Sequence, residues 1–206
     1  LADGEPTAGL GDEIARLASS AARSLARAHV ARAREDAAWL PEAEFAAALE
    51  DLGSDPLAVA DRFGCSPLAA MRRMAGAAGM QAGLVACDGS GTLIFRKPAT
   101  GFPLPRFGSA CPLWPLYAAL GRPMQPVEAR VQMVGQSDRR HRVVAWGEVR
   151  HPQGLRGPEL REAAMLILPD DGDGPVTRIG SSCRVCARGD CPARREPSIL
   201  ASEGVA

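Results

Sequence analysis

Lysine and aromatic residues are nearly missing from this chain. Only Lys97 is a lysine among 24 basic residues, and Phe, Trp and Tyr together make up 4%. The basic residues are matched by 24 acidic ones, so no net charge favours binding to nucleic acid or to a membrane surface. No segment approaches the roughly 18 uninterrupted apolar residues that a membrane-spanning helix requires. These absences favour a protein that touches neither DNA nor lipid through this part of its sequence.

Targeting signals are also missing. Residues 1–6 carry no basic segment followed by an apolar run, so we expect no signal peptide and a cytoplasmic location. The chain has no starting Met, and we expect it to be a piece of a longer protein. In the reducing cytoplasm, clustered cysteines more often hold metal than form disulfides.

The common catalytic motifs do not occur. There is no His-Glu-x-x-His, Walker loop, dinucleotide fingerprint or Gly-x-Ser-x-Gly. His29, His141 and His151 have no partner at the spacing of a metal site or a catalytic triad. We therefore expect a protein that is not an enzyme.

The hydrophobic pattern predicts an α+β protein with two parts. Hydrophobic residues make up 46% of the chain, enough for a core. Helices are predicted over 11–38 and 42–52, followed by a pair of helices over 57–75. We assign residues 1–76 to a helical region and residues 77–206 to a second domain.

The pair of helices resembles a helix-turn-helix. Gly64 makes the turn, Ser66 caps the second helix and Pro67 takes its first position. A helix that reads DNA bases needs several polar side chains, and this one offers only Arg72 and Arg73. We therefore favour a pair that packs onto its own domain.

The second domain has the strand and helix order of a PAS- or GAF-like sensor. Two apolar runs, Gly83–Cys87 and Thr92–Arg96, flank a Gly-rich turn and predict a β-hairpin. A short helix is predicted over Trp114–Gly121. Three further strands are predicted at Val127–Val134, Arg142–Val149 and Ala163–Leu168. The fold expected is a PAS/GAF-like antiparallel sheet with a cysteine-rich, metal-binding C-terminal tail.

Three cysteines of this tail lie within nine residues. Cys183, Cys186 and Cys191 form a C-x2-C-x4-C run that ends in Cys-Pro; cluster-binding loops of ferredoxins use similar short spacings, and the bacterial type also ends in Cys-Pro. Three thiolates leave one position open, and Cys111 is the natural fourth ligand because it is also followed by proline. Cys111 precedes the predicted helix, where a helix N-terminus would favour its thiolate form. Cys65 and Cys87 stand alone in the sequence, and we expect each to act as a small buried apolar residue.

The spacing leaves the metal open. Zinc also takes C-x2-C pairs and four thiolates, but its sites more often join two such pairs. A compact triplet with one distant cysteine favours an iron–sulfur cluster, with a structural zinc site as the alternative and a site without metal as a third possibility.

Two segments resemble the short-chain fatty acyl regulator family. They are Gly101–Trp114, with its Phe-Gly-Ser-Ala-Cys-Pro-Leu-Trp ending, and Ile179–Cys186 continuing through Cys191-Pro192-Ala193-Arg194-Arg195 to Pro197. The likeness covers about residues 36–200. These proteins are XRE-type bacterial transcription regulators of propionate, methylcitrate and glyoxylate metabolism.

The resemblance implies an effector and sensor module. Family members begin with a λ-repressor-like DNA-binding domain, which is absent here, so DNA would be contacted only through that domain. The resemblance implies a [4Fe–4S] cluster held by the four cysteines and sensing of a short-chain acyl-CoA. We expect the helical region to contact other subunits, in a homodimer or homo-oligomer, or the missing domain.

An acyl-CoA would need positive groups for its phosphates and an apolar pocket for its acyl chain. The candidates lie around the connection to Cys111 and are Arg96, Lys97, Arg106, Phe102, Phe107 and Trp114. The sequence departs from the family at Pro115-Leu116-Tyr117, where Asn-Val-His is usual.

Overall fold

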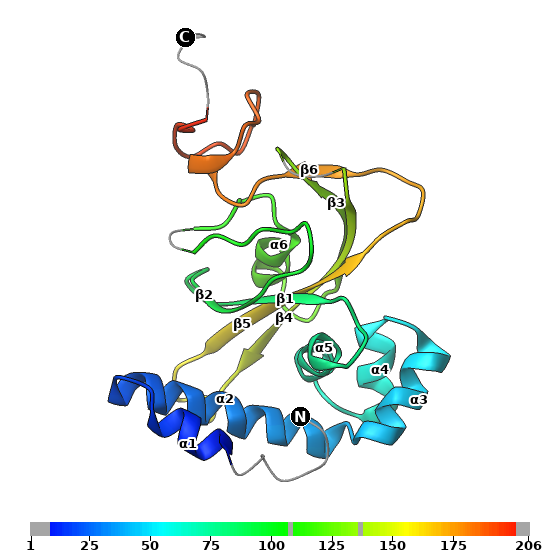
Figure 1. Cartoon of the computed structure of the whole chain (residues 1–206), viewed down its shortest axis with the longest axis vertical. Helices are drawn as coiled ribbons and strands as arrows, with labels where there is room; N and C mark the ends of the chain where they lie inside the picture. The colour runs from blue at the N-terminus through cyan, green and yellow to red at the C-terminus, as the bar shows by residue number, and fades with distance from the viewer. Residues whose placement is uncertain (1–8, 107–108, 136–137, 201–206) are drawn as a thin grey trace. The chain divides into compact units, whose positions relative to one another are not determined.

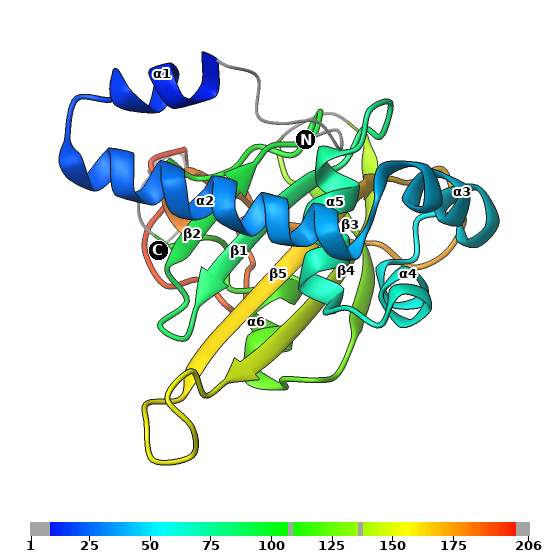
Figure 2. The same cartoon turned by 90° about the horizontal axis from the view of Figure 1, so that it is seen from below.

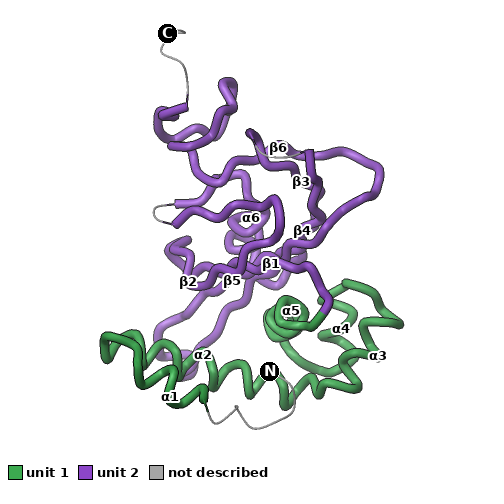
Figure 3. Tube along the Cα trace, in the orientation of Figure 1, with its two compact units in different colours: residues 1–78 green, residues 79–206 purple. Residues whose placement is uncertain are grey.

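The chain divides into two compact units. The computed structural model describes residues 9–106, 109–135 and 138–200. One unit comprises residues 1–78 and the other residues 79–206 (Figure 3). The sequence-based boundary, between residues 76 and 77, lies two residues earlier.

The first unit is helical, as predicted. Its helices are α1 (Gly9–Ala15), α2 (Ser20–Trp39), α3 (Glu42–Leu52), α4 (Pro56–Phe63) and α5 (Pro67–Gly76). The prediction of a single helix over 11–38 is wrong, because the helix is interrupted between the end of α1 at Ala15 and the start of α2 at Ser20. Ser19 causes the new start: its side-chain oxygen accepts a hydrogen bond of 3.0 Å from the Ala22 N–H and caps α2.

The turn between α4 and α5 is confirmed. Gly64 has φ of 61°, the left-handed conformation that glycine adopts without strain, and Ser66 accepts a hydrogen bond from the Leu68 N–H. Arg72 makes a bidentate ion pair with Asp36, with N–O distances of 2.7 and 2.8 Å. The buried Arg73 binds Glu42 at 2.9 Å. Both arginines are thus engaged within their own unit, as the structural interpretation of this helix pair expects.

Among its described residues, the second unit has a six-stranded sheet and one α-helix, α6 (Pro115–Gly121). The strands are β1 (Gly83–Asp88), β2 (Leu93–Lys97), β3 (Val127–Met133), β4 (Arg140–Arg150), β5 (Leu160–Pro169) and β6 (Thr177–Ile179). Their order is β2-β1-β5-β4-β3-β6. The first five strands in this order pair antiparallel with their neighbours, which confirms the predicted hairpin and the three further strands (Figure 1). Helix α6 confirms the predicted short helix.

Strand β6 is the one that the sequence did not predict. It has three residues, and only Ile179 faces the core. β6 runs parallel to β3, with Met133 opposite Ile179. The chain that follows Ile179 then lies alongside the loop before α6. The candidate site is formed by these two segments.

Helix α6 packs against β4 and β5 with very close backbone contact (Figure 2). A β-carbon on Gly147 of β4 would lie 3.0 Å from the Ala119 carbonyl carbon and still closer to its oxygen. Only glycine lets the helix backbone approach the strand this closely. The packing of α6 on the sheet therefore depends on Gly147, and so does the position of the loop before α6.

Replacing Gly147 with Ala should lower the free energy of unfolding by about 3 kcal/mol, because the rigid Ala119 backbone cannot yield as a side chain would. Gly121→Ala is the matched control: it also lies at the α6 region, and its β-carbon would meet no atom within 4 Å. The control should change stability by less than about 1 kcal/mol in urea unfolding. Equal effects of the two substitutions would refute the close-packing explanation.

The core of the second unit contains a buried histidine, His141, in β4. His141 is 1% exposed, and its Nε2 lies 3.1 Å from the Thr100 carbonyl oxygen. Its ring meets Phe102 edge-on, with centroids 5.3 Å apart. In the described part of the chain its Nδ1 has no hydrogen-bond partner. Burial lowers the pKa of His141, and the charge of Arg139 acts the same way, against opposing effects of Thr100 and Asp170.

The unfolded chain should therefore bind a proton more readily than the folded one. As pH falls below the ordinary value of 6.5, unfolding of the metal-free protein should become easier, and this loss should level off below the lowered pKa. We expect His141→Gln, which cannot titrate, to flatten the pH dependence of stability between about pH 7.5 and pH 5. The free energy of unfolding is measured by urea titration at each pH. If it depends on pH as steeply in the variant as in the wild type, groups other than His141 set this dependence.

Candidate metal centre

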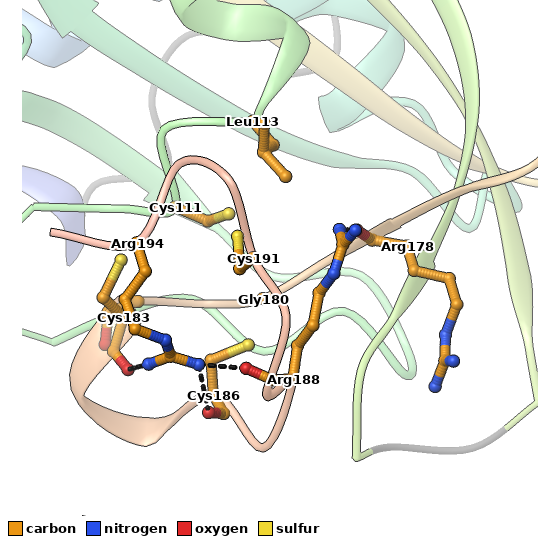
Figure 4. Close-up of a pocket in the computed structure, with 10 residues that line it drawn as sticks. Cys111, Leu113, Arg178, Gly180, Cys183, Cys186, Arg188, Cys191 and Arg194 are labelled. Atoms are coloured by element: carbon orange, nitrogen blue, oxygen red, sulfur yellow. Dashed lines mark hydrogen bonds between the residues drawn. The ribbon is translucent and has the colours of Figure 1, made fainter. Parts of the chain in front are cut away.

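The four predicted cysteines line one pocket. Cys111 lies in the loop before α6, and the others lie after β6, where Cys183 opens a short 3-10 turn, Cys183–Val185. Cys111, Cys183 and Cys186 are buried, and Cys191 is half-buried. Figure 4 shows the four side chains around the pocket, with the sulfur atoms of Cys111 and Cys191 pointing toward each other. The remaining lining residues are Leu113, Arg178, Gly180, Ser182, Arg188 and Arg194.

Backbone and side-chain hydrogen bonds dock the tail onto the loop before α6. The Cys111 N–H donates to the Ser181 carbonyl oxygen at 2.9 Å. The indole N–H of Trp114 donates to the Gly180 carbonyl oxygen at 2.8 Å. From beyond the cysteines, Arg195 donates to the Ala110 carbonyl oxygen at 2.6 Å. These contacts join residues that are 66 to 85 positions apart, so tertiary structure brings Cys111 to the triplet.

Gly180 makes room for a sulfur atom. A β-carbon at this position would lie 2.8 Å from the Cys186 Sγ and 3.1 Å from its Cβ. The chain before the triplet therefore forms a cradle that a larger residue would fill. A side chain at position 180 would displace the Cys186 thiol from the place that it takes in the pocket lining.

The donor set fits a soft metal centre. Four thiols on one pocket match the ligands of an iron–sulfur cluster or of a four-cysteine zinc site. As the side chains stand, no group of three or more His, Cys, Asp or Glu among the described residues has the arrangement that holds a metal ion. The four cysteines share a pocket, and their role as ligands stays a prediction.

The expectation that a helix N-terminus favours the Cys111 thiolate is wrong for the free thiol. Burial raises the pKa of Cys111, and the N–H groups near it, from Gly180 and Leu113, offset only part of this effect. Helix α6 has seven residues and starts four positions later, so its dipole contributes little. A bound cation would reverse this balance, because a coordinated thiol loses its proton.

The other two cysteines lie outside the pocket lining. Cys87 is fully buried in β1, and burial raises its pKa to about 12, so it stays a neutral thiol. Cys65 lies in the turn between α4 and α5 of the helical unit.

The residues predicted for an acyl-CoA do not share this pocket. Exposed Arg96 donates to the Pro105 carbonyl oxygen at 3.2 Å, and Lys97 donates to the Ala82 carbonyl oxygen at 2.8 Å. Arg106 is exposed, and Phe107 lies outside the described residues.

The two remaining candidates are core residues in this structure. Phe102 and Trp114 are each 1% exposed, and their ring centroids are 5.4 Å apart. They could wall a ligand pocket only if the two rings separated. Their role in ligand binding stays a prediction.

Sequence reasoning missed three contributors to the site. It gave Trp114 a place beside a ligand, whereas its indole N–H holds Gly180. The cradle at Gly180 was not predicted, although the glycine itself is part of the cysteine motif. Arg195 entered the sequence analysis only as part of the family-like segment, and its bond to Ala110 depends on a contact that local sequence cannot reveal.

Comparison with known proteins identifies the family. Residues 71–205 match the model described as "Short-chain fatty acyl coenzyme A regulator, C-terminal". A propionyl-CoA carboxylase regulator from Cereibacter sphaeroides is 30% identical over 205 residues, covering 91% of this chain and 44% of that protein. The HTH-type transcriptional regulator RamB of Mycobacterium tuberculosis is 34% identical over 133 residues, covering 56% of this chain and 27% of that protein.

A solved structure supports the same relationship. A Mycobacterium tuberculosis transcriptional regulator superposes with a TM-score of 0.78 at 27% identity, covering 96% of this chain and 66% of that one. The chain spans less than half the length of the curated relatives named above. None of the helices that the structure describes has the length and hydrophobicity needed to span a bilayer. The matched region includes all four cysteines, and the chain belongs to the short-chain fatty acyl coenzyme A regulator family.

Proposed function

We propose that this chain is the effector-sensing part of a bacterial transcription regulator, with an iron–sulfur cluster bound by Cys111, Cys183, Cys186 and Cys191. The second unit would act as a PAS/GAF-like sensing domain and would carry out no catalysis. DNA would be contacted through a separate domain of the longer protein. The helical unit would join subunits in a homodimer or connect to that domain.

One observation carries the proposal. Four cysteines singled out by their spacing and Cys-Pro context line one pocket, although Cys111 is far from the others in sequence. Chance would rarely bring the two Cys-Pro motifs of the chain to the same place. The two remaining cysteines, which lack that context, lie elsewhere.

The compact triplet favours a cluster over zinc. Three cysteines within nine residues and one distant cysteine followed by proline resemble cluster loops more than paired zinc knuckles. When bound, an iron–sulfur cluster would supply a redox-sensitive centre. A structural zinc site remains the alternative, and it would leave ligand or partner binding as the only signal.

The position of the pocket suggests how sensing would be transmitted. The four thiols come from two segments, the loop that leads into α6 and the C-terminal tail. Ligation by all four would hold these segments together, and loss of ligation would release the tail. Two arrangements of one tail are the kind of bistable element that a regulator requires.

The colour of the protein tests this assignment. A cluster absorbs broadly in the visible range and bleaches on reduction or chelation, whereas four-cysteine zinc is colourless. Brown protein that loses its colour together with its iron would support the proposal. Colourless protein with one tightly bound zinc would favour the alternative.

We also propose that a short-chain acyl-CoA is a ligand, as the family description and the propionyl-CoA carboxylase regulator suggest. Propionyl- or acetyl-CoA should raise the melting temperature in a saturable way, since a ligand at about 100 times its Kd stabilises by about 2.7 kcal/mol. Replacing the exposed Arg96 and Arg106 with Ala should weaken this shift without unfolding the protein.

Arg156→Ala is the matched control, because this exposed arginine lies in the β4–β5 loop of the same unit. It should leave the shift unchanged. If no short acyl-CoA moves the melting temperature of metal-loaded protein, the metal centre is the only sensor in this chain.

A further inference from the structure

One arginine side chain connects both halves of the cysteine tail. The Nη1 of Arg194 donates to the Cys183 carbonyl oxygen at 3.3 Å and to the Glu196 carbonyl oxygen at 3.4 Å. Its Nη2 donates to the Cys186 carbonyl oxygen at 3.4 Å and to that of Arg188. Figure 4 shows this guanidinium beside the pocket, with three of these bonds drawn.

Hydrogen bonds, more than apolar packing, fix the shape of the tail. In its described part after β6 the regular structure is one 3-10 turn, and Val185 and Ile199 are exposed rather than packed in a core. Besides the bonds of Arg194, the Arg195 side chain binds the Ala110 carbonyl oxygen and the Ile199 N–H binds the Arg184 carbonyl oxygen. A loop without an apolar core relies on hydrogen bonds to hold its backbone. Two of the four carbonyl groups that Arg194 binds belong to Cys183 and Cys186, so this side chain helps to set the backbone from which their thiols project.

The charge of Arg194 also suits the site. A guanidinium keeps its positive charge at all relevant pH values. Four thiolates around zinc or around a cluster leave a net negative charge, which a neighbouring cation offsets. Arg194 lines the pocket that such a centre would occupy.

We propose that Arg194 is the positioning residue of the cysteine loop: it fixes the backbone of Cys183 and Cys186 before metal binds and offsets the thiolate charge afterwards. The second half of this inference rests on the proposed metal site. The first half does not, since it rests on the hydrogen bonds of Arg194 alone.

Lysine cannot replace arginine in this role. Its ammonium group carries the same charge, but it is a compact point with three donors, not a planar fork that reaches carbonyls on two sides. Arg194→Lys therefore separates geometry from charge. Arg184→Lys is the matched control, because Arg184 lies in the same loop and its side chain is exposed.

Amide hydrogen exchange of the metal-free, reduced 206-residue chain tests the preorganisation. The amides from Cys183 to Cys191 should exchange at least about tenfold faster in Arg194→Lys than in Arg184→Lys, since charge-assisted hydrogen bonds are lost. Amides of β5 should stay equally protected in both, which shows that the fold is intact. Equal exchange of the loop in the two variants would overturn the inference.

Metal affinity provides the second readout. Partners that orient ligands typically contribute ten- to a hundredfold in affinity, so Arg194→Lys should lose metal to a chelator about tenfold more readily than Arg184→Lys. Equal retention would overturn the metal-related half of the inference. Wild-type protein that holds neither iron nor zinc would instead refute the proposed function, and the exchange comparison would still decide whether Arg194 organises the loop.

Discussion

Replacing any one of Cys111, Cys183, Cys186 or Cys191 with serine will abolish the metal centre or weaken it severely. A serine hydroxyl is a poor ligand for a soft metal and stays protonated where a thiol would ionise. Structural thiolate sites bind zinc with roughly 10–16 kcal/mol, so losing one of four ligands lowers affinity by orders of magnitude. The measurement is bound iron, sulfide and zinc per chain after purification under matched anaerobic conditions.

Two controls use the remaining cysteines. Cys65→Ser changes a residue in the helical unit, and Cys87→Ala changes a buried residue without placing a hydroxyl in the core. Both variants should retain the full metal content of the wild type. A Cys111→Ser variant with unchanged metal would remove Cys111 from the ligand set and leave a three-cysteine site.

Removing the metal should make the end of the tail sensitive to protease while the rest of the chain stays resistant. The sensitive region should begin at Cys183, because residues before it are held by protein contacts alone. Strand β6 pairs with β3, the Ile179 side chain is 1% exposed, and the Cys111 N–H binds the Ser181 carbonyl oxygen. Beyond Cys183 the exposed side chains offer little apolar burial, so ligation supplies much of the ordering free energy.

Trypsin can locate this boundary, since arginines lie on both sides of it. Cleavage after Arg184 and Arg188 should become at least about tenfold faster on chelation, because local opening exposes the backbone. Cleavage after Arg178 should stay slow, as this residue lies within paired β6. Equal resistance of metal-free and metal-loaded protein would show that the centre is incidental to the fold.

Local signals predicted most of the fold. The turn at Gly64 and the cap at Ser66 act over a few residues, so the sequence alone indicates them. The alternating and apolar runs likewise predict five of the six strands. The break before α2 was missed, because the apolar spacing continues across it and only the cap at Ser19 marks the new start. Strand β6 was missed because three residues with one buried side chain carry almost no pattern.

The candidate site was predictable in its residues but not in its construction. The spacing of Cys183, Cys186 and Cys191 is local, and the Cys-Pro context of Cys111 singles it out. How Cys111 reaches the triplet depends on contacts between distant residues, such as the bond from Trp114 to Gly180. The same limit applies to Trp114, since sequence cannot tell a ring that is buried in the core from one that faces a ligand.

The acid–base state of the site also depends on tertiary structure. The position of Cys111 before a helix predicts a thiolate, but burial in the folded chain raises its pKa. The balance between these effects depends on how deeply the loop is packed. A pattern of residues does not contain that information.

Iron, acid-labile sulfide and zinc analysis of anaerobically purified protein, combined with its visible absorption spectrum, tests the central claim most directly. A cluster held by the four cysteines predicts brown protein with iron and sulfide in equal amounts, close to four of each per chain for [4Fe–4S]. One equivalent of zinc without iron or sulfide in colourless protein would contradict the iron–sulfur assignment. Absence of all three from folded protein would contradict the metal centre itself.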